Sequence, residues 1–393
     1  MSDDGLEQKC IQEVFDTNKW GEDVKEDKNT EAFLELVRAG LWEKEARLST
    51  YGDIDYSVLL NLAEEQSVVG LIASGLNHFS NIRAPQEMVL QFVGEALQIE
   101  QQNTAMNSFI GRLINEMRNV GIYALLIKGQ GVAQCYEKPL WRTSGDVDLL
   151  LSEENYNKAY RFLTPLASNV EKEIEFNKHI AMTIEGWKVE LHGSLHGGLW
   201  SSIDCELDKV QGAIFYGGSV RSWLNGGTQV FLPGANEDAV YVFAHILEHF
   251  FYGGVGLRQV CDWCRLLWRY QSELDLRLLE SRIYEMGVMS EWRAFGAFAV
   301  EYLGMPAETM PFYDSRFKQK GERVMRFILE VGNFGHNRDR SYYETEPYLK
   351  RKAISFWRHT TDGAKYFCIF PMDSLRLWWK MLTHGMLAVV QRR

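Results

Sequence analysis

The chain has 393 residues, of which 46% are hydrophobic and 13% aromatic, so a disordered or fibrous protein is excluded. Its 42 basic and 53 acidic residues give a net charge of −11, which argues against general binding to nucleic acid or anionic membranes. The sequence has no run of eighteen apolar residues, its first ten residues lack the apolar core of a signal peptide, and its six cysteines are irregularly spaced. We therefore expect a cytoplasmic protein without a membrane span.

Hydrophobic periodicity divides the chain into four parts. Residues 1–30 are rich in charge and predict a mobile leader. Residues 31–120 predict a helical block, residues 121–235 a small α/β core, and residues 236–393 a helical domain. The predicted fold class is therefore α+β, with a small mixed β-sheet flanked by helices on both sides in sequence.

The N-terminal block repeats apolar residues with the 3.6-residue period of an α-helix. This period predicts helices over Glu31–Leu41, over Tyr56–Leu76 and, as one or two helices, over Pro85–Val120.

The core shows short apolar runs that are typical of buried strands. Between the first two runs, Gly129 and Gly131 predict a turn into a short helix that ends near Tyr136, and Ser152 predicts the cap of a further helix. The predicted strands are Ile122–Ile127, Val147–Leu151, Ile180–Ile184, Lys188–His192 and Gln229–Leu232.

Helical periodicity returns at Glu237. A basic and aromatic segment, Lys350–Lys380, then leads into the last helix. The predicted C-terminal helices are Ala239–Phe250, Leu257–Tyr270, Leu274–Met286, Trp292–Leu303 and Ser374–Gln391.

Three carboxylates of the core have the spacing of a metal site. Asp146 and Asp148 lie two residues apart at the start of a strand, so their side chains point to the same side of the sheet. Glu190 alternates with apolar residues on a later strand and joins them if the two strands are neighbours. An Asp-x-Asp pair also occurs at solvated strand edges. Three acidic groups around two divalent ions would suit phosphoryl or nucleotidyl transfer.

Basic residues upstream favour the metal site over a solvated edge. Lys128 ends a predicted strand and precedes the Gly129 turn into a helix, whose N-terminus would suit a phosphate group. Arg142, four residues before Asp146, would either bind a phosphate with two hydrogen bonds or pair with a nearby aspartate.

The run LLIKGQGVAQCYEKPLWRTSGDVDLLL, followed by VELHGSL, resembles the signature of the uncharacterised nucleotidyltransferase family of the polymerase-beta-like superfamily. The resemblance extends from about Glu31 to Leu267. It implies a mixed-sheet nucleotidyltransferase core, Mg²⁺ dependence and an NTP donor. The chain departs from the superfamily in carrying Gly129-Gln130 where a glycine-serine or glycine-glycine pair is usual, and in a longer spacing to Asp146.

These observations predict a metal-dependent nucleotidyltransferase that moves an NMP from an NTP, such as ATP, to a hydroxyl group. Asp146, Asp148 and Glu190 would be the catalytic and metal-binding residues for Mg²⁺ or Mn²⁺. Lys128, Gly129 and Arg142 would bind the triphosphate. The main alternative is a non-catalytic nucleotide-binding or interaction protein with the same fold.

A second alternative is a zinc hydrolase. His245-Ile246-Leu247-Glu248-His249 matches the H-x-x-E-H pattern of some zinc peptidases, with His245 and His249 one helical turn apart. The flanking residues are strongly apolar, which favours a core helix whose histidines bond to the catalytic core, with Asp262 as one candidate partner. One histidine lining the acceptor pocket is an intermediate possibility.

The acceptor is expected to be a protein side chain or a small metabolite. Residues 193–236, where an acceptor would enter, carry Asp204, Glu206 and Asp208 against Lys209 and Arg221. A nucleic acid needs a row of cations to neutralise its phosphates. Residues 350–380 are the one segment of the sequence where such a row would fit.

Overall fold

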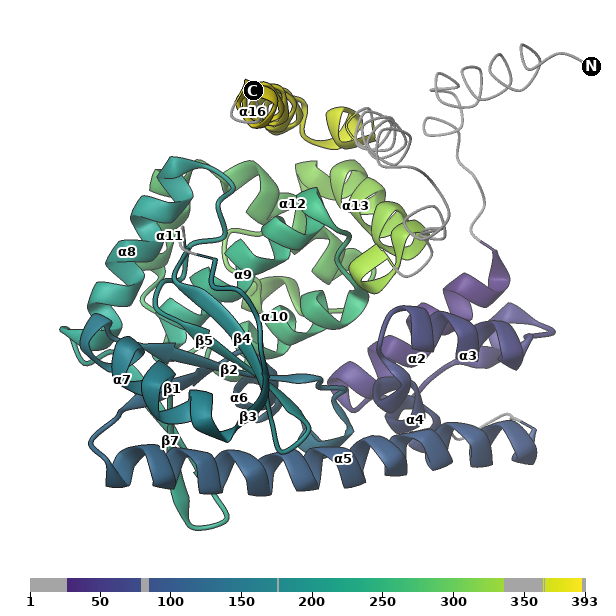
Figure 1. Cartoon of the computed structure of the whole chain (residues 1–393). Helices are drawn as coiled ribbons and strands as arrows, with labels where there is room; N and C mark the ends of the chain where they lie inside the picture. Colours follow the sequence, from purple (N-terminus) through teal and green to yellow (C-terminus); the bar gives the residue numbers. More distant parts are fainter. Residues whose placement is uncertain (1–26, 79–84, 175–176, 336–362, 364, 391–393) are drawn as a thin grey trace, which may run out of the picture.

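The computed structural model describes residues 27–78, 85–174, 177–335, 363 and 365–390 (Figure 1). The predicted leader lies outside the described residues up to position 26, and so do residues 350–362 and 364 of the basic and aromatic segment. Among the described helices, none combines the length and apolarity needed to cross a lipid bilayer.

The N-terminal block is helical, as predicted, but its boundaries differ. The segment predicted as helical over Tyr56–Leu76 is two helices, because Ser67 between them has a left-handed backbone with φ of 57°. The side chain of Asp55 caps the first of them by accepting from the backbone N–H groups of Ser57 and Val58. The block consists of α2 (Lys28–Trp42), α3 (Tyr56–Glu65), α4 (Val69–Asn77) and α5 (Gln86–Asn119).

The last of these helices, α5, joins the N-terminal block to the core. It is a single helix of 34 residues, which makes it about 50 Å long at the usual rise per residue. Figure 1 shows it running along one side of the molecule, past the N-terminal helices at one end and the sheet at the other. One element therefore fixes the position of both.

The described part of the core contains one mixed, seven-stranded sheet with the order β3-β4-β5-β2-β1-β7-β6. Its central strand β2 is antiparallel to β1 and parallel to β5, so the neighbouring relation that the carboxylate prediction required is present. The strands are β1 (Ala124–Ile127), β2 (Asp146–Leu151), β3 (Ala167–Val170), β4 (His179–Ile184), β5 (Trp187–His192), β6 (Val220–Asn225) and β7 (Thr228–Pro233).

The two faces of the sheet are covered differently. One face carries a purely apolar cluster that includes Val147, Leu149 and Val189 and packs against α5 and the helix α7 (Glu153–Leu163). Ser152 caps α7 as predicted, since its hydroxyl accepts from the backbone N–H of Asn155. On the opposite face the alternating positions of β2 and β5 carry the carboxylates. The alternation of side chains along each strand therefore places apolar core residues on one face and the carboxylates on the other.

Helices α9 (Ala235–Tyr252) and α10 (Leu257–Arg269) lie on the carboxylate-bearing side of the sheet, where residues of both line one pocket together with Asp146 and Asp148. Helix α6 (Gly129–Ala133) leaves β1 there but is only five residues long and ends before the predicted Tyr136. The remaining helices are α8 (Ser201–Phe215), α11 (Leu276–Met286), α12 (Met289–Glu301), α13 (Lys318–Val331) and α16 (Pro371–Val390). The elements β3, α8, β6 and α13 were not predicted from the sequence.

Candidate active site

The register of two parallel strands brings the three predicted carboxylates together. Asp148 of β2 lies opposite Glu190 of β5, and Asp146 lies opposite Lys188. Each of Asp146, Asp148 and Glu190 offers an oxygen within 4.8 Å of the oxygens of the other two. This arrangement could hold a divalent cation, because hard cations prefer several oxygen ligands.

The electrostatics of the two aspartates differ although they lie two residues apart. The Asp148 carboxylate and burial together raise the pKa of Asp146 above its usual value. Burial would also raise the pKa of Asp148, but Lys128 and His192 outweigh it and hold that pKa below its usual value. The Nζ of Lys128 lies 3.0 Å from Asp148 Oδ1, and His192 Nε2 lies 2.9 Å from the same oxygen.

Glu190 is surrounded by basic groups. Although burial disfavours its charge, His179, His192 and Lys188 together lower its pKa. His179 Nε2 lies 3.0 Å from Glu190 Oε2, and Lys188 forms an ion pair with the other carboxylate oxygen. Glu190 is therefore ionised over the physiological range.

Lys128 lies at the end of β1 in a backbone conformation that side chains rarely adopt. Its φ is 55°, and that of the following Gly129 is 40°, so two consecutive residues occupy the left-handed half of backbone space at the cleft. Burial alone would lower the pKa of Lys128, but Asp148 and other nearby groups raise it well above the usual value. The lysine is therefore a permanent cation beside the carboxylates.

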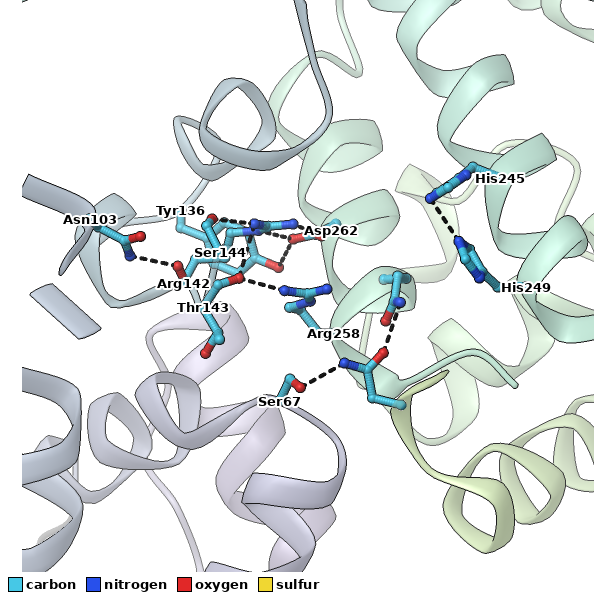
Figure 2. A network of polar contacts seen from close by, with 12 residues as sticks. Ser67, Asn103, Tyr136, Arg142, Thr143, Ser144, His245, His249, Arg258 and Asp262 are labelled. Atoms are coloured by element: carbon cyan, nitrogen blue, oxygen red, sulfur yellow. Dashed lines mark hydrogen bonds and ion pairs between the residues drawn. The ribbon is translucent and has the colours of Figure 1, made fainter. Parts of the chain in front are cut away.

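Arg142 lies in the same cleft but is held by a partner 120 residues away. Its Nε and Nη2 donate to the two carboxylate oxygens of Asp262 at 3.0 and 2.6 Å, and its Nη1 donates to Ser144 Oγ at 2.6 Å (Figure 2). Tyr136 also donates to Asp262. Of the two alternatives drawn from the sequence, pairing with an aspartate is the one observed here, and the aspartate belongs to α10.

Arg258, which sequence reasoning missed, lies one helical turn before Asp262 on α10 and lines the same cleft. Its Nη1 donates to the carbonyl oxygen of Thr143 at 2.7 Å, while its buried Nε has no hydrogen-bond partner among the described atoms. Burial and the nearby Arg142 lower its pKa to about 10. A signal was available, since the four-residue spacing places Arg258 and Asp262 on one face of a helix.

The H-x-x-E-H helix, α9, borders the same cleft. His245 lines it, and its Nε2 lies 3.1 Å from Nε2 of His249 (Figure 2). The Nδ1 of His245 lies 3.5 Å from Glu248 Oε2. Burial and Lys128 lower the pKa of His245 well below its usual value. Asp262, the partner considered for these histidines, is bound to Arg142 instead. Across the described residues, two groups of three potential metal ligands converge, and neither contains His245 or His249.

These side chains enclose one cleft between the sheet and the C-terminal helices, with about 530 Å³ of empty volume, part of it open to solvent. Two of the carboxylates lie at its base, and two arginines and one lysine lie around it. Its lining residues include Lys128, Gly129, Arg142, Asp146, Asp148, His245, Arg258 and Asp262.

Comparison with known proteins agrees with the resemblance seen in the sequence. The model of a family described as "uncharacterised nucleotidyltransferase" matches residues 52–304, which include every residue of the cleft. No curated protein and no solved structure matches the chain. The mixed sheet flanked by helices is the predicted α+β nucleotidyltransferase fold. The chain therefore belongs to the uncharacterised nucleotidyltransferase family.

Proposed function

We propose that the protein transfers a nucleoside monophosphate from an NTP to a hydroxyl group of a protein side chain or small metabolite, with Mg²⁺ or Mn²⁺ as its cofactor. The observation that carries the proposal is the convergence of Asp146, Asp148 and Glu190, the first two of which line a cleft that also contains Lys128 and Arg258. Anionic metal ligands beside cations are the combination that a bound metal–triphosphate requires.

Each residue then has a distinct role. Asp146, Asp148 and Glu190 would hold the divalent ions, which neutralise the triphosphate and polarise the α-phosphorus. Lys128 would exchange its ion pair with Asp148 for a phosphate oxygen when the carboxylate takes up the metal ion. The acceptor oxygen would attack the α-phosphorus as pyrophosphate leaves, and Glu190 would help to pass the hydroxyl proton on to water, because the lowered pKa of this carboxyl prevents it from keeping the proton.

Arg258 fits the triphosphate better than Arg142 does. The guanidinium of Arg142 already donates to Asp262, Ser144 and the carbonyl oxygen of Thr143. Arg258 has a buried N–H without a partner among the described atoms, and leaving such a donor unpaired costs roughly 1–3 kcal/mol. A phosphate oxygen would satisfy it. We therefore assign the phosphate-binding role to Lys128 and Arg258, with Arg142 holding the wall of the cleft.

Two features favour a small or protein acceptor over a nucleic acid. The chain is acidic, at −11, and α8, which follows β5, carries Asp204, Glu206 and Asp208. A polynucleotide would require several cations along its path.

The experiment is a screen of the four NTPs with Mg²⁺ or Mn²⁺, in which pyrophosphate release is measured and self-modification is read as a mass increase of one nucleotide. The Asp148→Asn variant should lose the activity, and Asp53→Asn, which changes an exposed carboxylate of the N-terminal block, should keep it. Tight binding of Mg·NTP without pyrophosphate release under any condition would favour the non-catalytic alternative.

A further inference from the structure

The carboxylates have histidine neighbours that an all-oxygen magnesium site does not need. His179 of β4 and His192 of β5 are register partners in adjacent antiparallel strands, so both side chains lie on the carboxylate-bearing side of the sheet. Their ring centroids are 4.7 Å apart. Together with Glu190 they form the second of the two groups of described residues in which three potential metal ligands converge.

We infer that His179, His192 and Glu190 form a separate cation subsite that takes a first-row transition-metal ion in preference to Mg²⁺. Imidazole nitrogens suit ions such as Zn²⁺ and Co²⁺, whereas carboxylate and water oxygens suit Mg²⁺. The inference rests on the proposed function for its place in the reaction, because Glu190 would connect this subsite to the one formed by Asp146 and Asp148.

The separations between the ligand atoms match such an ion. Glu190 Oε2 lies 3.0 Å from His179 Nε2 and 3.7 Å from His192 Nε2. Ligand bonds of about 2.0–2.1 Å in a tetrahedral zinc site place neighbouring ligand atoms ~3.3 Å apart, which is between these two values. The Lys188 ammonium contacts the other oxygen of Glu190, Oε1, so it does not block Oε2. A bound ion would displace the protons that His179 Nε2 now shares with Glu190 Oε2 and that His192 Nε2 shares with Asp148 Oδ1.

The protein environment gives the histidines a reason to be there other than packing. A buried ion pair that serves only stability is commonly no better than an apolar pair of the same volume. Here two histidines and two lysines accompany three carboxylates on neighbouring inner strands of the sheet. His192 is 9% exposed and Glu190 is 9% exposed, so the groups are shielded from water but lie beside a cleft.

The test uses Co²⁺, whose visible absorption reports nitrogen ligands, and Zn²⁺ in calorimetry. The full-length protein is first saturated with Mg²⁺ to fill the oxygen subsite and is then titrated. About one equivalent of Co²⁺ should bind despite the excess Mg²⁺. His179→Gln and His192→Gln should each weaken that binding by about 10–100-fold or more and should lower the intensity of the absorption bands.

Two controls make the result decisive. His78→Gln removes an imidazole beside Glu137 in the N-terminal block and should change nothing, while His245→Gln tests the H-x-x-E-H helix. Unchanged Co²⁺ binding in both cluster variants would overturn the inference, and so would loss of binding in His245→Gln alone. Thermal unfolding of each metal-free variant reports whether it is folded. If a glutamine variant does not fold, His179→Asn or His192→Asn replaces it in the same titration.

The readout separates this inference from the proposed function. Histidine-dependent Co²⁺ binding without pyrophosphate release from any NTP would leave the subsite standing and remove the transferase proposal. Nucleotidyl transfer with Mg²⁺ and no histidine-dependent Co²⁺ binding would support the transferase proposal and overturn the histidine subsite.

Discussion

Two buried polar clusters border the same cleft and are built on different principles. Around Asp262, the charge is matched atom by atom, since both carboxylate oxygens accept from Arg142 and one also accepts from Tyr136. Around Asp148 and Asp146, two anions lie next to each other, and the first raises the pKa of the second. The Asp262 cluster therefore holds two parts of the fold together, whereas the carboxylate cluster has the uncompensated negative charge that the proposed metal site requires.

The largest effect should come from breaking the carboxylate cluster. Asp148→Asn removes the charge that Lys128 and His192 now share, and with it one ligand of the proposed metal site. We expect pyrophosphate release at saturating NTP and Mg²⁺ to fall on the order of 10³-fold, equivalent to ~4 kcal/mol of transition-state stabilisation. Activity within a few-fold of the wild type would contradict the proposed role, provided that the variant is folded by circular dichroism.

Breaking the Asp262 cluster should instead reduce stability. Asp262→Asn leaves Arg142 next to Arg258 without the counter-charge, and Arg142 already lowers the pKa of Arg258 to about 10. We expect the free energy of unfolding in urea to fall by about 3–4 kcal/mol. The double variant Arg142→Met/Asp262→Leu should recover most of this loss, because it removes both buried charges. A loss below ~1 kcal/mol in the single variant would show that the pairing is not structural.

The sequence predicted the carboxylate cluster better than the Asp262 cluster. The reason is the separation along the chain between the residues that come into contact. Asp146, Asp148 and Glu190 follow from alternation within two strands, with one assumption about which strands are neighbours. The partner of Arg142 lies 120 residues away, and the pairing of His179 with His192 depends on a strand register. Neither relation has a local pattern.

Two of the unpredicted elements of the fold, β6 and α8, have local explanations instead. The strand β6 has no fully buried residue, so it lacks the apolar run that marked the inner strands. Helix α8 buries Ile203, Leu207, Val210 and Ile214, so a helical period was present in the sequence but was not used to predict a helix. In contrast, α5 proved to be one helix despite Gly94 and Gly111, because it packs against both the N-terminal helices and the sheet.

A second pair of buried acidic residues, Glu291 and Asp373, does not line the cleft and sharpens the comparison. Burial and Asp373 raise the pKa of Glu291 to about 9. Since the pKa in the unfolded chain is near 4.5, the folded state binds the extra proton, and this contribution to stability is lost as pH rises from about 4.5 to 9. Glu291→Gln should therefore increase the free energy of unfolding at pH 8 by about 1–3 kcal/mol, with little effect near pH 4. Urea unfolding at several pH values measures this, and a gain independent of pH would contradict it.

The two arginines of the cleft extend the comparison to ligand binding. Arg258→Gln should weaken NTP binding by about 10-fold, or ~1.4 kcal/mol, because a partly unsatisfied guanidinium is available to a phosphate. Its stability should change little, since the substitution also relieves repulsion from Arg142. Arg269→Gln, at the exposed end of the same helix, is the matched control. Calorimetry with a non-hydrolysable NTP makes the comparison, and equal affinities for the two variants would exclude the assigned role.

The smallest effect concerns the two neighbouring aspartates, which should respond with opposite signs. The pKa of Asp146 is raised by Asp148 and burial, so ionisation of Asp146 destabilises the folded chain once pH exceeds the usual carboxyl value. Asp146→Asn should therefore stabilise the metal-free protein at pH 7 by about 0.5–1 kcal/mol. The pKa of Asp148 is lowered, so its charge is favourable in the folded state and Asp148→Asn should destabilise. Urea unfolding in EDTA measures both variants.

Adding Mg²⁺ should then reverse the order of stability of the wild type and the Asp146→Asn variant. A ligand that binds the folded state alone raises the free energy of unfolding by RT ln(1 + [L]/Kd). The wild type should therefore gain stability with increasing Mg²⁺, whereas Asp146→Asn, having lost one ligand oxygen, should gain less and fall below it at high concentration. If the two unfolding curves stay parallel over the whole Mg²⁺ range, Asp146 is not a ligand, and its repulsion from Asp148 needs another explanation than a metal site.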